Sequence, residues 1–443
     1  MNNSVRTDET DLPVKGSIGL FTAISIIIAD MIGTGIFTTT GMVARDVKSA
    51  TTLLALWGVG GLIALCGALS YARLAAHMPE SGGEYYYLSR MYHPLIGFLS
   101  AWISLIAGFS APIAAAAVAF GIYLKRLFPA IDTQTTAVIL IVAVACTQLS
   151  GSRRGFIMHN LFTLLKIVLL LFLVVYGFMA TPVIAQPVLG PISLDTLFKP
   201  EHAVSLIFIS FAYSGWNAAT YIAGDVRNAR KVVPLALLFG TLIVMVLYLL
   251  LNAVYLRYND IEVIRNSSAE VGYVTAVGIF GSSGGGIIAG IIVVVLMSSI
   301  SSMIIAGSSV VQATGKDIPM FAFLALKSCR GNCPLGVILQ SGVAILFVLT
   351  SSFEQILYYI GFSISIFSML AVAGSMAIIF RESSSFKPLR FVPPLLFVVF
   401  SLWSVIFSIK QYPSGLLFFF ITIAIGTFLF WFSQRNGKAS IAT

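Results

Sequence analysis

Two ionisable residues stand inside long apolar stretches of this chain. Lys166 lies in LFTLLKIVLLL and Asp30 lies in ISIIIADMIG. If these stretches cross a membrane, a charge within them costs at least about 2.5 kcal/mol, so we expect each residue to face the interior of a helix bundle and to have a function. Snorkelling to the surface is the simpler alternative for Lys166, but the ammonium would then have a long way to reach.

The position of Asp30, just before Gly33, allows several interpretations. Its carboxylate could form a pair with Lys166, or it could carry a proton. It could also face a pocket and recognise a cationic amino acid or an amine. A polar pair deep in the scaffold is the structural alternative, and the residues by themselves leave all four open.

Glycine and hydroxyl residues interrupt two apolar runs near their middle. The first interruption is Ile32 to Phe37, IGTGIF, and the second is Phe211 to Trp216, FAYSGW. Glycine weakens a helix by about 1 kcal/mol relative to Ala, and small residues also serve close helix packing. Two such sites in corresponding halves of a membrane chain favour broken helices around a central binding site.

Composition places the chain in a membrane. Apolar residues make up 58% of its 443 residues and charged residues only 10%, whereas soluble domains carry roughly 25% charged residues. The net charge of +9 is spread singly and in pairs between apolar runs. A nucleic-acid-binding protein would cluster its basic residues on one face, so no nucleic-acid partner is predicted.

The apolar runs predict an all-α integral membrane protein with 12 transmembrane helices, each near the ~20 residues that cross a bilayer. The predicted spans are 17–45, 50–76, 84–123, 134–151, 155–180, 202–225, 232–257, 277–313, 335–351, 353–380, 390–409 and 413–433. The longest polar connection is predicted near 258–272. Connections on the side of the N-terminus carry roughly twice as many Lys and Arg residues as the others, which predicts that both termini are cytoplasmic.

Three motifs resemble the amino acid–polyamine–organocation superfamily, and its L-type amino acid transporter-like prokaryotic permeases in particular. The first is IGTGIF at 32–37. The second is PESGGEY at 79–85, and the third is FAYSGWNAATYIAGDVRNARKVVP at 211–234. The chain departs from the family at Asn228-Ala229, where the family has Asn-Pro, and at Arg73, where many members have an acid.

The resemblance implies a 5+5 inverted-repeat fold with broken helices 1 and 6. It divides the chain into a cytoplasmic tail (1–16), a ten-helix transport core (17–380) and helices 11 and 12 (390–433), followed by a second cytoplasmic tail (434–443). The two five-helix repeats of the core would run roughly over 17–180 and 202–380.

The resemblance also implies a set of site residues. The substrate carboxylate would meet backbone N–H groups of the first break, and the amino group would meet carbonyls of both breaks. The substrate-binding residues implied are Ile32, Gly33, Thr34, Gly35, Phe211, Ala212 and Ser214, with Tyr213 and Trp216 as candidates for an aromatic wall or gate. Helix packing is the simpler role for these two aromatic residues.

A lysine of segment five replaces the sodium ion in sodium-independent relatives, and the resemblance assigns this coupling role to Lys166. Its ammonium would contact the first broken helix and segment eight, where Ser298 and Ser299 are the expected partners. Lys166 would either titrate, coupling transport to protons, or remain a fixed cation. Asp30 is the second candidate for coupling.

The function predicted is secondary active transport of amino acids by alternating access, independent of sodium, through exchange or proton symport. The alternative is a transporter or exchanger of amines, polyamines or cationic amino acids. The four His residues do not cluster, so no metal site is predicted. The sequence has no Ser-His-Asp arrangement, phosphate loop or nucleotide motif, so no cofactor or enzymatic reaction is predicted. The connection from Lys125 to Thr133 has no Cys, so no covalently attached glycoprotein subunit is expected. The predicted location is the cell membrane, inner or plasma.

Overall fold

The computed structural model describes residues 18–47, 49–149, 153–182, 197, 199–267, 270–317, 322–323, 326, 333–382 and 388–439. Their regular elements are helices, and the β pairing within these ranges is one isolated bridge between Ile18 and Val226. The N-terminal tail predicted at 1–16, and the end of the C-terminal tail, lie outside the described residues.

Long helices form most of the molecule. They are α3 (Ala50–His77), α6 (Ala111–Leu127), α7 (Thr133–Leu149), α8 (Arg153–Met179), α12 (Ala229–Tyr258), α14 (Val271–Asp317), α15 (Pro334–Thr350), α16 (Phe353–Glu382), α17 (Val392–Gln411) and α18 (Pro413–Ala439). Shorter helices are α1 (Leu20–Met31), α2 (Gly35–Asp46), α4 (Gly83–Met91), α5 (Pro94–Ile103), α10 (His202–Ala212), α11 (Ala218–Tyr221) and α13 (Ile261–Ser267). Gly281, at φ 73°, kinks α14 near its start.

Helices occupy each of the twelve predicted spans. Within the described residues, seven helical stretches are long and apolar enough to cross a membrane, or eight if the bent pair α1 and α2 is counted as one span. Four further apolar helices are shorter. The chain is therefore a multi-span helical protein, whereas the exact number of spans and the inverted repeat remain predictions.

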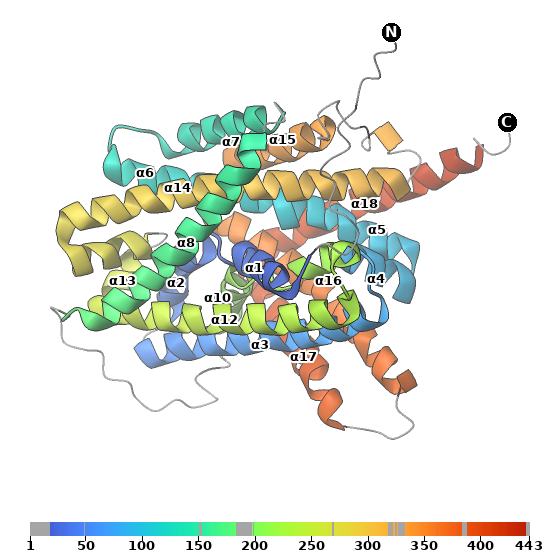
Figure 1. Ribbon diagram of the computed structural model, residues 1–443, viewed down its shortest axis with the longest axis horizontal. Helices are drawn as coiled ribbons and strands as arrows, with labels where there is room; N and C mark the ends of the chain where they lie inside the picture. Colours follow the sequence, from blue (N-terminus) through green and yellow to red (C-terminus); the bar gives the residue numbers. More distant parts are fainter. Residues whose placement is uncertain are drawn as a thin grey trace, which may run out of the picture.

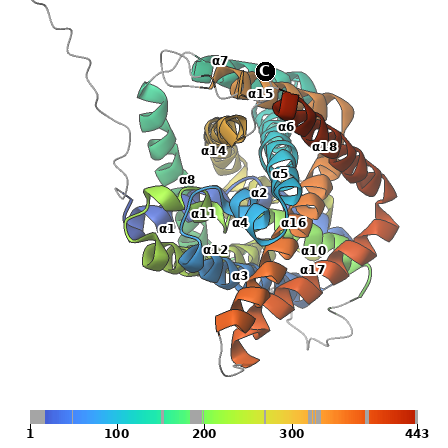
Figure 2. The same cartoon turned by 90° about the vertical axis from the view of Figure 1, so that its right-hand side faces the viewer.

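The long helices surround the two interrupted segments, which are α1 with α2 and α10 with α11. In Figures 1 and 2, α3 and α12 lie on one side of the molecule and α7 and α15 on the other, with α2 and α4 at a height between them. The long helix α12 packs along α3 and also against α1, while α10 packs against α2, α16 and α17. The interrupted segments are thus held in the interior.

The first interruption separates α1 from α2, which meet at an angle of 44°. Carbonyl groups freed there accept hydrogen bonds from other helices, because irregular backbone is tolerated at membrane depth only when it is satisfied inside the protein. Tyr248 donates to the Met31 carbonyl at 2.7 Å, and Tyr255 donates to that of Ile36 at 3.2 Å. Both tyrosines lie on α12, which therefore supports the bent backbone.

The second interruption follows α10. The chain turns at residues 213–217 before the single turn of α11 and a 3₁₀ turn at Ala223–Asp225. Gly215 has φ 97°, a conformation that residues with a side chain rarely adopt. Beyond the turn, Arg227 N donates to the Ile18 carbonyl, and Ile18 N donates to that of Asp225. The start of the first interrupted segment is thereby tied to the end of the second.

The predicted third segment is divided. A π-helix at Ser104–Ser110 joins α5 to α6. Pro112 lacks the N–H that an α-helix would need and clashes with the carbonyl one turn earlier, which accounts for the widened turn before it. The Ser110 hydroxyl donates to the Leu105 carbonyl at 2.8 Å within this turn.

The connection expected at 258–272 is partly helical, because it contains α13. Arg265 of this helix donates to the carbonyls of Ala44 and Val47, and Ile264 is fully buried. The helix forms there because it caps the end of α2, a contact that polarity along the sequence does not reveal.

Candidate functional site

A cavity of about 450 Å³ lies between the two interrupted segments. The first segment contributes Asp30, Gly33, Thr34 and Gly35, and the second contributes Phe211 and its neighbours. The remaining walls come from the turn before α4, the π-helix, and the second half of α14. This volume lies within the range of small-molecule sites.

The two interruptions touch each other at the cavity wall. A methyl group placed on Gly35 would lie 2.5 Å from the Ala212 Cα, and one placed on Gly215 would lie 2.7 Å from an Asp30 carboxylate oxygen. Such distances leave no room for a side chain. Glycine at both positions therefore allows the two irregular backbones to cross in direct contact, and both face one cavity.

Backbone donors at the first interruption are free. Helix α2 has no side-chain cap, and within the described residues the N–H groups of Thr34, Gly35 and Ile36 have no acceptor. The N-terminus of a helix with free N–H groups carries partial positive charge and suits a carboxylate. The carbonyls of Asp30 and Ala212 accept no hydrogen bond from the described residues, so they can receive an ammonium.

Lys166 contacts the backbone carbonyls of the first interruption. Its side chain is 3% exposed, and its ammonium donates to the carbonyls of Ala29 at 2.6 Å and Ile32 at 2.8 Å. Apolar side chains of α8, such as Leu164 and Val168, are exposed. The lysine therefore faces inward. Ile32, predicted as substrate-binding, is fully buried and holds this ammonium without lining the cavity.

Ser298 and Ser299 lie on α14 and are both buried. The Ser299 hydroxyl donates to the Val295 carbonyl within its own helix at 3.2 Å. The Ser298 hydroxyl has no partner among the described residues. The structure records no hydrogen bond from either serine to Lys166.

Asp30 opens into the cavity instead of pairing with Lys166. Its side chain is exposed to the cavity, although it lies in the last turn of α1 and deep in the helical assembly. The two charges are close enough to interact electrostatically. Within the part of the chain that the structure describes, no hydrogen bond or ion pair joins them.

Glu84 is a cavity residue that the sequence argument did not single out. It is 4% exposed, and its Oε1 accepts hydrogen bonds from Tyr71 at 2.6 Å, Ser368 at 2.9 Å and Asn217 at 3.1 Å. These donors lie on α3, α16 and the turn of the second interruption. One carboxylate thus joins the wall of the cavity to two long helices.

The paired glycines of PESGGEY explain how Glu84 is placed. Gly82 and Gly83 both have positive φ, at 120° and 52°, which residues with a side chain adopt at a cost. A methyl group on Gly83 would lie 2.7 Å from the Tyr221 ring. The motif therefore makes a tight turn that packs closely on α11. An acidic residue directly after two glycines was the sequence feature that could have identified Glu84 as a site residue.

Replacing Glu84 with alanine should destabilise the protein. The change removes the acceptor from the buried Tyr71 and Ser368 hydroxyls and leaves Asn217 only its bond to Tyr221, and each buried group left unsatisfied costs about 1–3 kcal/mol. We expect a clearly lower melting temperature in detergent, measured by fluorescence-detected size-exclusion after heating. Glu84→Gln retains a carbonyl acceptor and serves as the control. Equal melting temperatures for the two variants would contradict the role assigned to Oε1.

Tyr213 and Trp216 lie away from the main cavity. They line a second cavity of about 40 Å³ behind the turn. Tyr213 donates to the Trp57 carbonyl at 3.1 Å, and Trp216 packs edge-on against Tyr71 at 4.8 Å between ring centroids. The aromatic residues that line the main cavity are instead Tyr85, Phe109, Phe211 and Tyr221.

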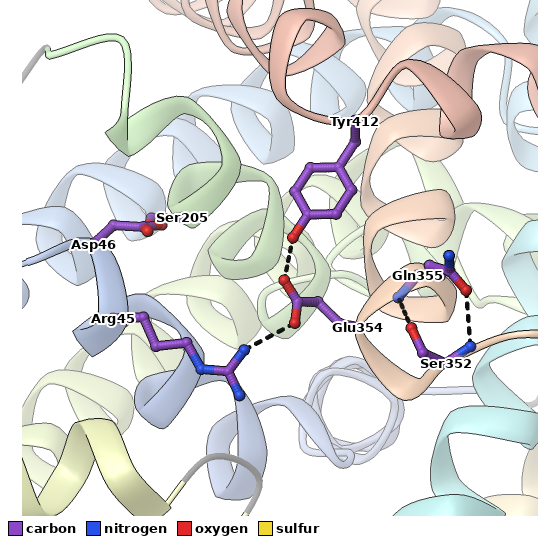
Figure 3. A network of polar contacts seen from close by, with 7 residues as sticks. All are labelled: Arg45, Asp46, Ser205, Ser352, Glu354, Gln355 and Tyr412. Atoms are coloured by element: carbon purple, nitrogen blue, oxygen red, sulfur yellow. Dashed lines mark hydrogen bonds and ion pairs between the residues drawn. The ribbon is translucent and has the colours of Figure 1, made fainter.

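A polar network ties the far end of α2 to neighbouring helices (Figure 3). Glu354 pairs with Arg45 at 2.8 Å and also accepts a hydrogen bond from Tyr412. Burial, together with this carboxylate, raises the pKa of Tyr412, so its hydroxyl stays protonated. Beside it, Ser205 donates to Asp46 at 2.9 Å.

This network and the cavity lie toward opposite ends of the molecule. Asp46 precedes α3, whereas the cavity residue Ser81 follows it, and the 28 residues of α3 rise about 1.5 Å each. The network therefore links α2 to α10 and α16 at one end, while the cavity extends toward the other end. No group of His, Cys, Asp or Glu that could hold a metal occurs within the described ranges.

Comparison with known proteins matches residues 18–441 to the family model described as amino acid permease. The chain is 25% identical to the human (Homo sapiens) b(0,+)-type amino acid transporter 1, over 96% of this chain and 91% of that protein. It is 26% identical to the rabbit (Oryctolagus cuniculus) large neutral amino acids transporter small subunit 2, over 90% and 77%. It is also 26% identical to the human cystine/glutamate transporter, over 93% and 84%. All three relatives are transporters and not enzymes.

Proposed function

The chain belongs to the amino acid permease family, and from this premise we propose that it carries amino acids across a membrane by alternating access. The observation that carries the proposal is the crossing of two interrupted helices at one cavity wall, with three free N–H groups beside it. A carboxylate fits these donors, and an ammonium fits the free carbonyls of Asp30 and Ala212.

The interrupted segments are the moving part in this proposal. They bind the substrate and rock against the scaffold of long helices, while the polar network around Glu354 opens and closes one entrance. The cavity and the closed network favour a state accessible from the end of the molecule near Ser81. With both termini in the cytoplasm, as the distribution of Lys and Arg favours, that end faces the cytoplasm.

Sodium independence follows from Lys166 in the same proposal. Its ammonium holds two carbonyls of the first interruption, and a fixed cation there does the work that a bound ion would do. Either exchange or proton symport then supplies the driving force. The cell membrane, inner or plasma, is the proposed location.

Uptake into proteoliposomes tests the proposal. We expect labelled amino acids to enter vesicles containing the purified protein in sodium-free buffer, and unlabelled amino acids to compete. Stimulation by a pH gradient would indicate symport, and stimulation by internal amino acid would indicate exchange. Protein-free vesicles are the control. No uptake under any of these conditions, or uptake only with sodium, would contradict the proposal.

A further inference from the structure

The charges around the main cavity are of one sign. Asp30 and Glu84 are the charged residues that line it, and its described lining contains no Lys, Arg or His. Lys166 does not line the cavity, and its ammonium donates to the carbonyls of Ala29 and Ile32. The lining of the cavity therefore offers acidic groups and no basic group to whatever occupies it.

The two carboxylates differ in how firmly they are held. Glu84 is almost fully buried, and one of its oxygens already accepts three hydrogen bonds. Asp30 is exposed to the cavity and has no hydrogen bond or ion pair among the described residues. Of the two, Asp30 is free to receive a ligand.

Asp30 lies at a place in its helix that disfavours a negative charge. It lies in the last turn of α1, where the helix dipole disfavours an anion. The contact of its carboxylate with Gly215 places it at the second interruption as well. The Asp30 carboxylate thus lines the same cavity as both interruptions. A small molecule bound between the interruptions can contact this carboxylate and the free N–H groups together.

We propose that the substrate is an amino acid with a cationic side chain, whose ammonium or guanidinium pairs with Asp30. This inference rests on the proposed function. When the cavity closes and water leaves, a neutral substrate would leave the Asp30 carboxylate without a hydrogen-bonding partner, and a buried carboxylate without one is costly. A cationic side chain removes that cost, while the substrate carboxylate occupies the N–H groups of Thr34, Gly35 and Ile36.

Lysine and norleucine provide the matched test, because their side chains differ by one ammonium group. Wild-type protein is reconstituted in vesicles preloaded with both, and uptake of each labelled compound is measured, with cadaverine as a third substrate. We expect lysine to be preferred over norleucine by about 30-fold in kcat/KM. In Asp30→Asn, the KM for lysine should rise by a similar factor, and the preference for lysine over norleucine should be lost.

The possible results separate the inference from the proposed function. Equal use of lysine and norleucine by the wild type would overturn the inference and support amino acid transport. Equal use of cadaverine and lysine would show that the substrate carboxylate is not recognised, which overturns both. Transport of none of the three would likewise overturn both.

The Asp30 variants distinguish recognition from coupling. If Asp30→Asn slows lysine and norleucine equally, the carboxylate acts in coupling and the inference fails. Asp30→Glu keeps the charge and covers the case in which Asp30→Asn does not fold, as judged by size-exclusion chromatography. This variant should still prefer lysine over norleucine, and loss of that preference would overturn the inference.

Discussion

Gly35→Ala is expected to lower uptake by about tenfold or more, because the new methyl group would meet the Ala212 Cα at 2.5 Å. Backbone atoms on both sides of the contact must then move, and overpacking of this kind costs about 1–3 kcal/mol. This movement would displace the free N–H groups of the first interruption and also the backbone of the second. Initial rates in proteoliposomes measure the loss, and equilibrium binding of the same amino acid shows whether the site itself is disturbed.

Gly342→Ala is the matched control. A methyl group on Gly342, within α15, meets no atom within 4 Å, and alanine favours a helix over glycine by about 1 kcal/mol. This variant should transport like the wild type and be no less stable. Wild-type rates in Gly35→Ala would show that the contact between the two interruptions is not required for transport.

Lys166→Ala is expected to slow transport more than it weakens binding. The change removes the donor from the carbonyls of Ala29 and Ile32, and each carbonyl left unsatisfied costs about 1–3 kcal/mol. Because the substrate would meet other groups of the interruption, its affinity should change little. We expect a fall in kcat of about tenfold or more with a KM within about threefold of the wild type.

Lys410→Ala provides the comparison for Lys166→Ala. Lys410 is exposed near the end of α17, with its ammonium over the Phe407 ring at 5.6 Å. Exposed contacts of this kind contribute about 0.5–1 kcal/mol, so transport should be retained. Equal turnover in Lys166→Ala and the wild type would remove the role proposed for Lys166.

The interruption at Gly33 illustrates what local sequence can predict. Glycines within an apolar run weaken helix formation whatever surrounds them, and the structure ends α1 at Met31 and begins α2 at Gly35. The inward orientation of Lys166 could also be predicted from local sequence, because a charged side chain in an apolar membrane helix is tolerated only when it faces the interior of the bundle. The stretch at 258–272 differs, because the packing of α13 on α2 stabilises a helix that its polarity does not predict.

The position of the two interruptions could be predicted from the sequence, but the direction of their side chains could not. Gly33, Thr34, Gly35, Phe211, Ala212 and Ser214 line the main cavity, and their role in binding stays a prediction, whereas Tyr213 and Trp216 line the smaller cavity behind the turn. In an irregular turn the direction of each side chain depends on dihedral angles such as the positive φ of Gly215. Periodicity gives no information on these angles, so the aromatic wall could not be assigned from the sequence.

A multi-span helical protein, two interrupted segments and an inward lysine could be predicted from the amino acids alone, because apolar run length, glycine propensity and the cost of a membrane charge are local properties. Three contacts could be learned only from the folded protein. Gly35 meets Ala212, Asp30 opens to the cavity without an ion pair to Lys166, and Glu84 joins three elements. Each of these depends on the rotation and spacing of helices far apart in the chain. A rotation of about 100° per residue separates one face of a helix from the next, so such contacts are fixed only when the helices pack together.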